Sequence, residues 1–101
     1  MATITKRDLV IELSNTTGLT QREVFSVIQG LIDSVTASLA KNDEVVLRNF
    51  GTFLVKETKA KIGRNPHQPE KDVKIPPRTV VKFKPGKEMK EKVSKLYKKL
   101  H

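Results

Sequence analysis

The sequence predicts an α+β fold in a single domain, 1–101: two N-terminal helices, an antiparallel sheet with a long hairpin arm, and a C-terminal helix. Three observations support this prediction. Apolar residues recur with a helical period up to residue 42, β-prone runs alternate with turn residues over 43–84, and a helical period returns over 85–101. A chain of 101 residues has the length of one small domain.

The first helix is predicted to begin at Thr5 and to end at Gly18. The Thr5 hydroxyl suits an N-cap, and Asp8, three residues later, can accept a hydrogen bond from the cap amide. Ile4 and Leu9 have the spacing of a hydrophobic staple across this cap. Gly18 supplies the left-handed residue that often ends a helix.

The second helix repeats this start signal, with Thr20 as the cap and Glu23 three residues later, so the two helices are expected to form a hairpin. Lys41–Asn42 should end it, because Asn tolerates the left-handed conformation. Its apolar face is wide and needs a broad partner. The residues on this face are Val24, Phe25, Ile28, Leu31, Ile32, Val35 and Leu39.

Two short strands are predicted next, at 44–47 and 52–55, with Arg48–Gly51 as the tight turn between them. The polar run 56–61 continues the second strand outward.

The arm is predicted at about 56–80, with turn-forming residues at 62–72 and a returning strand at 73–83. Pro76 and Pro77 confine the returning strand to an edge, because neither can donate a ladder hydrogen bond. The arm is therefore a two-stranded ribbon without a buried face.

The last predicted helix, 85–101, is basic and amphipathic. Its apolar residues recur at helical spacing, so one face should pack while the other displays lysines. The apolar positions are Met89, Val93, Leu96, Tyr97 and Leu100.

The arm removes about a quarter of the chain from any core, which leaves too little apolar burial to stabilise a monomer. We therefore expect a dimer, although the same spacing also fits an ordinary intramolecular core. The candidate dimer-core residues are Phe50, Phe53, Phe83, Leu31 and Val35.

Charge is distributed unevenly along the chain. Lys and Arg number 20 and Asp and Glu 11, for a net charge of +9. Residues 1–55 contain five basic and six acidic side chains, so the remaining residues contain 15 basic and five acidic ones. This excess indicates a polyanionic partner, either nucleic acid or an anionic membrane. The membrane is disfavoured because no aromatic, Leu-rich amphipathic helix is present for surface insertion.

Several other classes are excluded. The chain has no Cys, which rules out disulfides, zinc knuckles and thiol catalysis. Gly86–Lys87 fails as a phosphate-binding loop, because Val81 stands where a Gly is needed and Glu88 where a Ser or Thr is needed. His67 and His101 are isolated from carboxylate clusters, so no metal site is expected. We predict no enzymatic activity, no cofactor and no small-molecule substrate.

Three segments together resemble the bacterial HU/IHF histone-like DNA-binding family: Asn49–Phe53, Gly63–Pro66 and Val80–Gly86. They occur in the family's order and near its spacings, with two helices before them and one after. The resemblance implies an intertwined two-fold dimer with a helical base, a saddle of sheet, and two arms that wrap DNA from the minor groove. The last helix runs further than is usual in the family, as does the arm tip, 67–72.

The resemblance also assigns roles at the arm tip. Pro66 is expected to wedge between base pairs, which suits a rigid apolar ring without an N–H; the alternative is an ordinary turn proline. Arg64 is expected to enter the minor groove, where negative potential is concentrated. The alternative is a solvated cation in a loop. Asn65 has two open readings, contact with a base edge or a bond to its own backbone.

Phosphate contacts are expected along the arm, the saddle and two helix starts. Lys84 and Lys87 flank Pro85–Gly86, where free amides and the helix dipole favour a phosphate. The candidate residues are Lys6, Lys56, Lys59, Lys61, Lys74, Arg78, Lys82, Lys84, Gly86 and Lys87.

The sequence thus predicts an architectural protein of the cytoplasmic nucleoid that binds and bends double-stranded DNA with little sequence preference, as a homodimer. Three alternatives stay open: an IHF-like factor that prefers particular sites, a heterodimer with a paralogous chain, and a basic RNA-binding or ribosome-associated structural protein.

Overall fold

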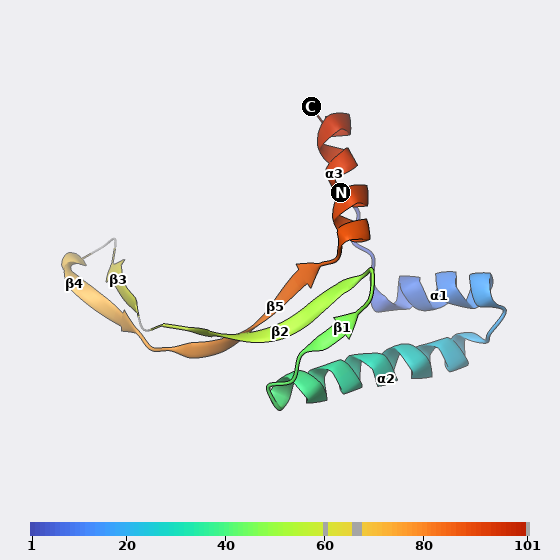
Figure 1. The fold of residues 1–101 in the computed structure, drawn as a ribbon, viewed down its shortest axis with the longest axis horizontal. Coiled ribbons are helices and arrows are strands. Elements are labelled where there is room, and N and C mark those ends of the chain that lie inside the picture. The colour runs from blue at the N-terminus through green and yellow to red at the C-terminus, as the bar shows by residue number, and fades with distance from the viewer. Residues whose placement is uncertain (60, 66–67, 101) are drawn as a thin grey trace. The chain divides into compact units, whose positions relative to one another are not determined.

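The computed structural model describes the backbone of residues 1–59, 61–65 and 68–100, and the side chains of residues 1–59 and 76–100. Its elements confirm the predicted α+β class (Figure 1). They are α1 (Lys6–Thr17), α2 (Gln21–Ala40), β1 (Val45–Leu47), β2 (Gly51–Thr58), β3 (Lys61–Asn65), β4 (Gln68–Ile75), β5 (Arg78–Pro85) and α3 (Lys87–Leu100). The chain divides into two compact units, Met1–Ala37 and Ser38–His101.

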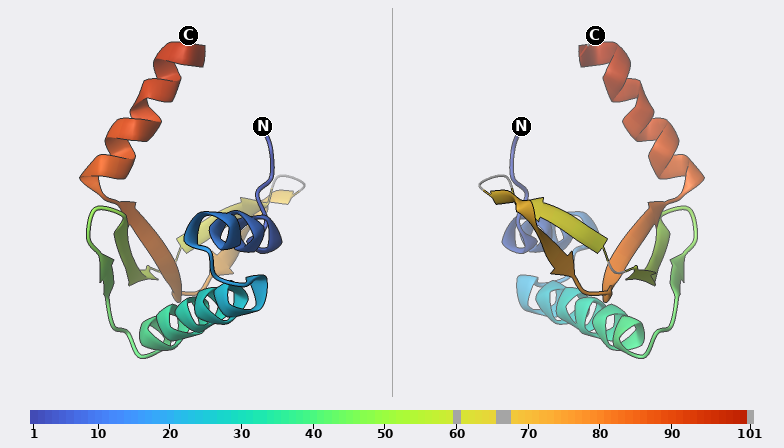
Figure 2. Two further views of the ribbon diagram at one scale, coloured as in Figure 1. Left: turned by 90° about the vertical axis from the view of Figure 1, so that its right-hand side faces the viewer. Right: turned by 90° about the vertical axis from the view of Figure 1, so that its left-hand side faces the viewer.

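The helical hairpin of the first unit is built on the predicted caps (Figure 2). The Thr5 hydroxyl accepts from the Asp8 amide at 3.2 Å, and the Asp8 carboxylate accepts from the Thr5 amide at 2.9 Å. Thr20 and Glu23 repeat this exchange at 3.1 and 3.2 Å. Two hydrogen bonds to the Asp8 carboxylate lower its pKa: first the one from the Thr5 amide, and second one that the Thr5 hydroxyl donates at 3.0 Å. Gly18 ends α1 with φ 77°, as predicted.

The second helix, α2, ends within two residues of its predicted end, and Asn42 takes the predicted left-handed conformation with φ 66°. By length and composition alone α2 would also suffice to cross a membrane, a property that it shares with core helices of soluble proteins. Its Val24 is only 4 % exposed, whereas Phe25 is 47 % and Leu31 51 % exposed.

The sheet of the second unit contains three antiparallel strands in the order β1-β2-β5. The predicted turn joins β1 to β2, with Asn49 left-handed at φ 68° and the Phe50 amide donating to the Leu47 carbonyl at 3.0 Å. Gly51 is required at the start of β2. A Cβ there would collide with the Phe83 ring and lie 2.7 Å from the Lys84 carbonyl oxygen.

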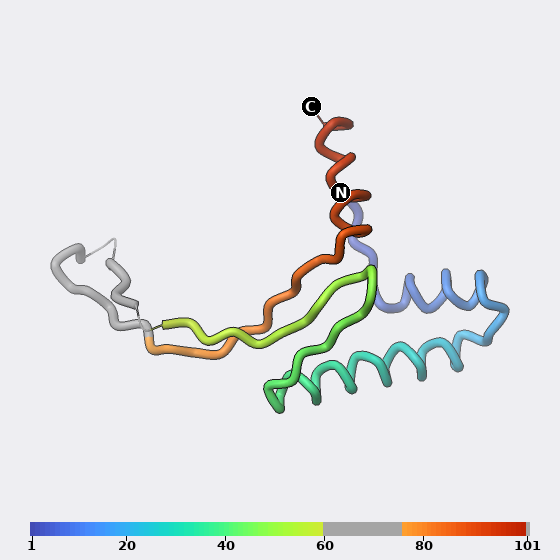
Figure 3. The backbone as a smooth tube through the Cα atoms, in the orientation of Figure 1, coloured from blue at the N-terminus to red at the C-terminus, as the bar shows by residue number. Residues whose placement is uncertain are grey.

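The predicted continuous returning strand at 73–83 is wrong in one respect, because it is divided. The strands of the β2–β5 ladder run side by side in the coloured part of the trace in Figure 3, and the ladder ends at the pair Thr58↔Arg78. A separate β3–β4 ladder begins at Lys61↔Ile75. Pro76 and Pro77 lie between them. Two successive residues without an N–H cannot donate to a ladder, which explains the interruption.

The end of the β2–β5 ladder is closed by a side chain. The Thr58 hydroxyl donates to the Arg78 carbonyl at 3.2 Å and accepts from the Arg78 amide at 3.3 Å. This exchange fixes the register at the last pair before the prolines.

Candidate nucleic-acid interface

The β2–β5 ladder sorts its side chains onto two faces. Residues directly opposite each other in an antiparallel pair share a face, and so do alternate residues along one strand. Thr52 is opposite Lys84, Leu54 opposite Lys82, Lys56 opposite Val80 and Thr58 opposite Arg78. Four of the predicted phosphate-binding residues therefore lie on one face, which we call the basic face: Lys56, Arg78, Lys82 and Lys84.

All four side chains of the basic face are exposed to solvent. None of them makes an ion pair with a side chain that the structure describes. The face therefore offers four accessible cations along one side of a single ladder, an arrangement that suits a row of phosphates.

The opposite face carries the aromatic residues predicted for the dimer core. Phe53 is paired with Phe83 in the ladder, and their ring centroids are 4.7 Å apart. Phe50, from the β1–β2 turn, adds a second contact to Phe83 with a centroid distance of 5.5 Å. The structure thus brings the three phenylalanines together, whereas the predicted Leu31 and Val35 belong to α2 in the first unit.

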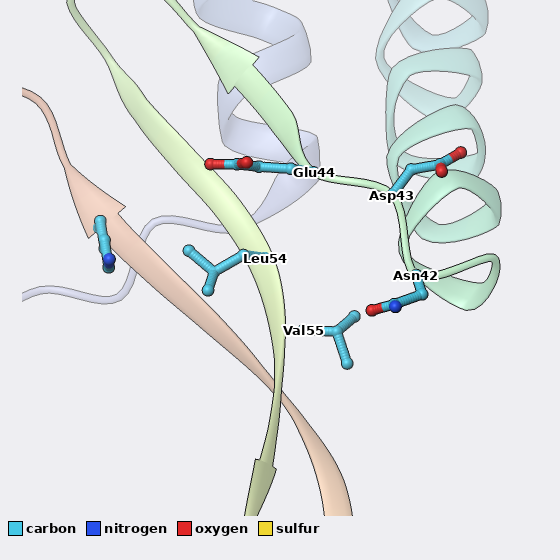
Figure 4. A pocket seen from close by; sticks show the side chains of 6 residues that line it. Asn42, Asp43, Glu44, Leu54 and Val55 are labelled. Carbon is cyan, nitrogen blue, oxygen red and sulfur yellow. The ribbon is translucent and has the colours of Figure 1, made fainter.

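Acidic residues border the basic face near Lys84. The loop before β1 supplies Asp43 and Glu44 to a hollow of about 360 Å³ that Lys84 also lines, together with Leu54 and Val55 (Figure 4). These carboxylates reduce the positive potential on that side of Lys84.

The predicted role of the Gly86 amide is not met. The Gly86 N–H donates to the Phe50 carbonyl at 2.8 Å, so this amide is not free to bind a phosphate. The Gly86 carbonyl accepts from Lys90 at 3.0 Å, which makes Gly86 the N-cap residue of α3. Helix geometry leaves the next amides without partners in the helix, and Lys84 and Lys87 are exposed on either side of this cap.

Lys6, at the start of α1, is held against α2. Its Nζ donates to Gln29 Oε1 at 2.7 Å and lies 4.7 Å from the centroid of the Phe25 ring. Gln29 Nε2 in turn donates to Asp33 Oδ1 at 2.9 Å. No local pattern in the sequence connects Lys6 with Gln29, 23 positions later, so this contact was not predicted.

The arm positions are described by backbone alone. Lys59 follows β2 and is exposed. In the β3–β4 ladder Lys61 is opposite Ile75, Ile62 opposite Lys74, Arg64 opposite Asp72 and Asn65 opposite Gln68, with an irregularity between Arg64 and Asn65. The side chains of Lys61, Arg64, Asn65 and Lys74 lie outside the described residues, as do Pro66, His67 and His101 entirely.

No three His, Asp or Glu side chains within residues 1–59 and 76–100 gather into a possible metal site.

Comparison with known proteins identifies relatives over nearly the whole chain. Residues 4–94 match the family described as bacterial DNA-binding protein. DNA-binding protein HU of Thermus thermophilus is 42% identical over 93 residues, covering 92% of this chain and 95% of the relative. Integration host factor subunit alpha of a Marinomonas species is 39% identical over 93 residues, covering 92% and 94%.

The solved structures show the same likeness. A cocrystal structure of Anabaena HU with DNA has a TM-score of 0.81 and 30% sequence identity, and the match covers 88% of this chain and 96% of that one. HU from Thermotoga maritima has a TM-score of 0.64 at 27% identity, with coverage of 88% and 97%.

Proposed function

This chain belongs to the HU/IHF family of bacterial DNA-binding proteins, and we propose that it is a dimeric architectural protein that binds duplex DNA through the minor groove with little sequence preference and bends it. The observation that carries the proposal is the basic face. It places Lys56, Arg78, Lys82 and Lys84 on one side of the β2–β5 ladder, opposite the phenylalanines. Contacts from such lysines to phosphates supply affinity without reading sequence.

The dimer is supported by how little one chain buries. Among the described residues only Val10 and Val24 are buried apolar side chains, at 6 % and 4 % exposure. Obligate dimers bury about 2,000–5,000 Å² in total, and the exposed face of α2 and the Phe50 ring offer apolar surface for this purpose.

For the arm we propose the roles that the family implies. Pro66 wedges into a base step, and Arg64 and Asn65 enter the minor groove beside it. Lys59, Lys61 and Lys74 contact phosphates along the arm, and Lys6, Lys84 and Lys87 contact phosphates beside the body. We assign no catalytic step and place the protein in the cytoplasm, on the nucleoid.

A factor that prefers particular sites is the second candidate, because an integration host factor subunit alpha stands among the relatives at 39% identity. In that case the chain would also pair with a paralogous subunit.

One set of measurements tests the proposal. Sedimentation at micromolar concentration should show a dimer of the purified chain. Titration of several unrelated duplexes of equal length should give similar affinities that fall steeply with salt, by about 0.9 in logarithmic slope per phosphate neutralised. A folded monomer contradicts the dimer, large differences between duplexes favour the site-preferring alternative, and equal competition by duplex RNA favours the RNA-binding one.

A further inference from the structure

The last turns of α3 carry a concentration of positive charge that the family match does not cover. The match ends at residue 94, whereas α3 continues to Leu100. Residues 87–94 contain three lysines and two glutamates, but residues 95–100 contain three lysines and no acidic residue. The charge therefore rises along the helix towards its C-terminal end.

The lysines of the two parts of α3 also differ in their partners. Lys92 pairs with Glu88 at 3.5 Å, a spacing of one helical turn. Lys95, Lys98 and Lys99 make no ion pair with any side chain in the described part of the chain, and all three are exposed. These three lysines are available to an external anion.

The apolar side chains of α3 lie on the other side of the helix. At 100° per residue, the mean direction of Lys95, Lys98 and Lys99 is about 140° from that of the apolar residues Met89, Val93, Leu96 and Leu100. A helix packed by its apolar stripe therefore turns these lysines outward.

The lysine group belongs to a helix that follows the end of β5 distant from the arm. β5 runs from Arg78, next to the arm, to Pro85, next to α3 (Figure 1), a span of about 23 Å at about 3.3 Å per residue. From Lys87 to Lys99 the helix rises about 18 Å, the length of about five base pairs of duplex. A phosphate bound at the end of α3 would thus be a contact additional to those of the arm.

We propose that Lys95, Lys98 and Lys99 bind phosphates of the duplex beyond the segment held by the arm and the basic face, and so lengthen the DNA site; this inference rests on the function proposed above. The occupant is DNA because the same chain presents its other exposed lysines to a polyanion of extended length. The competing explanation is that cations in the last turn only offset the helix dipole.

The test replaces all three lysines with Gln, whose helix propensity is close to that of Lys. The matched control, Arg7→Gln with Arg22→Gln and Lys41→Gln, removes the same charge from the near-neutral part of the chain. A second variant, Lys95→Arg with Lys98→Arg and Lys99→Arg, retains the charge. Each dimer is titrated against duplexes of about 10, 20 and 40 base pairs, one to four helical turns, over a range of salt concentrations.

On the longest duplex we expect the Gln variant to lose salt slope: about 1.8 if one lysine per subunit contacts a phosphate, and about 5.4 if all three do. If the Gln variant and the wild type have equal affinity at 1 M salt, a slope loss of about 1.8 corresponds to about 60-fold weaker DNA binding at 0.1 M salt. The loss should grow with duplex length, and the Arg variant should bind like the wild type.

The inference would be overturned by a loss no larger than in the control, by a loss that is the same at every length, or by reduced helical content in circular dichroism with unchanged DNA binding. A Gln variant that loses binding to vesicles of phosphatidylserine and phosphatidylcholine, but not to DNA, would also overturn it. Wild-type protein that does not bind duplexes at all would instead refute the proposed function.

Discussion

Removal of two cations from the basic face should weaken DNA binding mainly through its salt dependence. In the double variant Lys82→Gln, Lys84→Gln the altered residues lie on one face of β5, opposite Leu54 and Thr52. Neither lysine makes an ion pair within the described residues, so their replacement should not unbalance a partner in the fold.

The magnitude follows from counting contacts. If each lysine binds one phosphate, the dimer loses four contacts and the slope of log affinity against log salt falls by about 3.6. With convergence at 1 M salt, this corresponds to a loss of about 300-fold at 0.2 M. Substitutions on the opposite face of the ladder, which carries Phe53 and Phe83, should leave this slope unchanged.

Fluorescence anisotropy with a labelled duplex, repeated at several salt concentrations, measures the slope directly. Arg7→Gln with Arg22→Gln provides the control, since it removes the same charge from α1 and α2. An unchanged slope in the Lys82, Lys84 variant, with the dimer intact, would refute the assignment of this face to phosphate. An equal drop in the control would show that net charge matters and the face does not.

Four further outcomes are expected. Pro66→Ala should preserve the dimer and most of the salt slope but reduce the DNA bend, measured by fluorescence transfer across a doubly labelled duplex; an unchanged bend would leave Pro66 a turn residue. Phe83→Ala, which removes the ring between Phe50 and Phe53, should lower the free energy of unfolding by about 3–5 kcal/mol in urea titrations. Gly51→Ala should destabilise by about 1–3 kcal/mol because its Cβ meets the Phe83 ring, whereas Gly30→Ala in α2, where a Cβ meets nothing within 4 Å, should stabilise by about 0.5–1 kcal/mol; the same sign for both would contradict this. The cap bonds from Thr5 lower the pKa of Asp8, and those from Thr20 lower the pKa of Glu23. The stability that these bonds contribute is therefore fully present above the usual pKa values of 3.8 and 4.5, and it is lost as the pH falls through the lowered pKa values. Asp8→Asn with Glu23→Gln should flatten the decline in helical content over that acidic range.

The features that the sequence predicted well are local ones. The caps at Thr5 and Thr20 and the left-handed ends at Gly18 and Asn42 depend on residues within about one helical turn, so a short pattern contains all their partners. The β1–β2 turn is equally local.

The features that it missed depend on distant partners. The Gly86 amide is occupied by the carbonyl of Phe50, which the β1–β2 turn brings to the end of β5. The division of the returning strand at Pro76–Pro77 could have been predicted from the sequence, because two successive residues without an N–H interrupt a ladder. The sequence did not predict that the basic residues of β2 and β5 share one face, because this depends on the register between the two strands. Alternation within a single strand does not determine that register.

The same contacts that stabilise the β2–β5 ladder also select the face that its lysines occupy. A slip of one residue in the pairing of β5 with β2 would move Lys82 and Lys84 to the side of Phe53, and it would move Phe83 to the opposite side. At one end of the ladder, the Phe83 ring fits against Gly51 and the Gly86 amide bonds to Phe50. At the other end, the Thr58 hydroxyl bonds to both the amide and the carbonyl of Arg78. Because both ends are fixed, the aromatic cluster that we assign to the dimer core also determines which side of the sheet is left to bind phosphate.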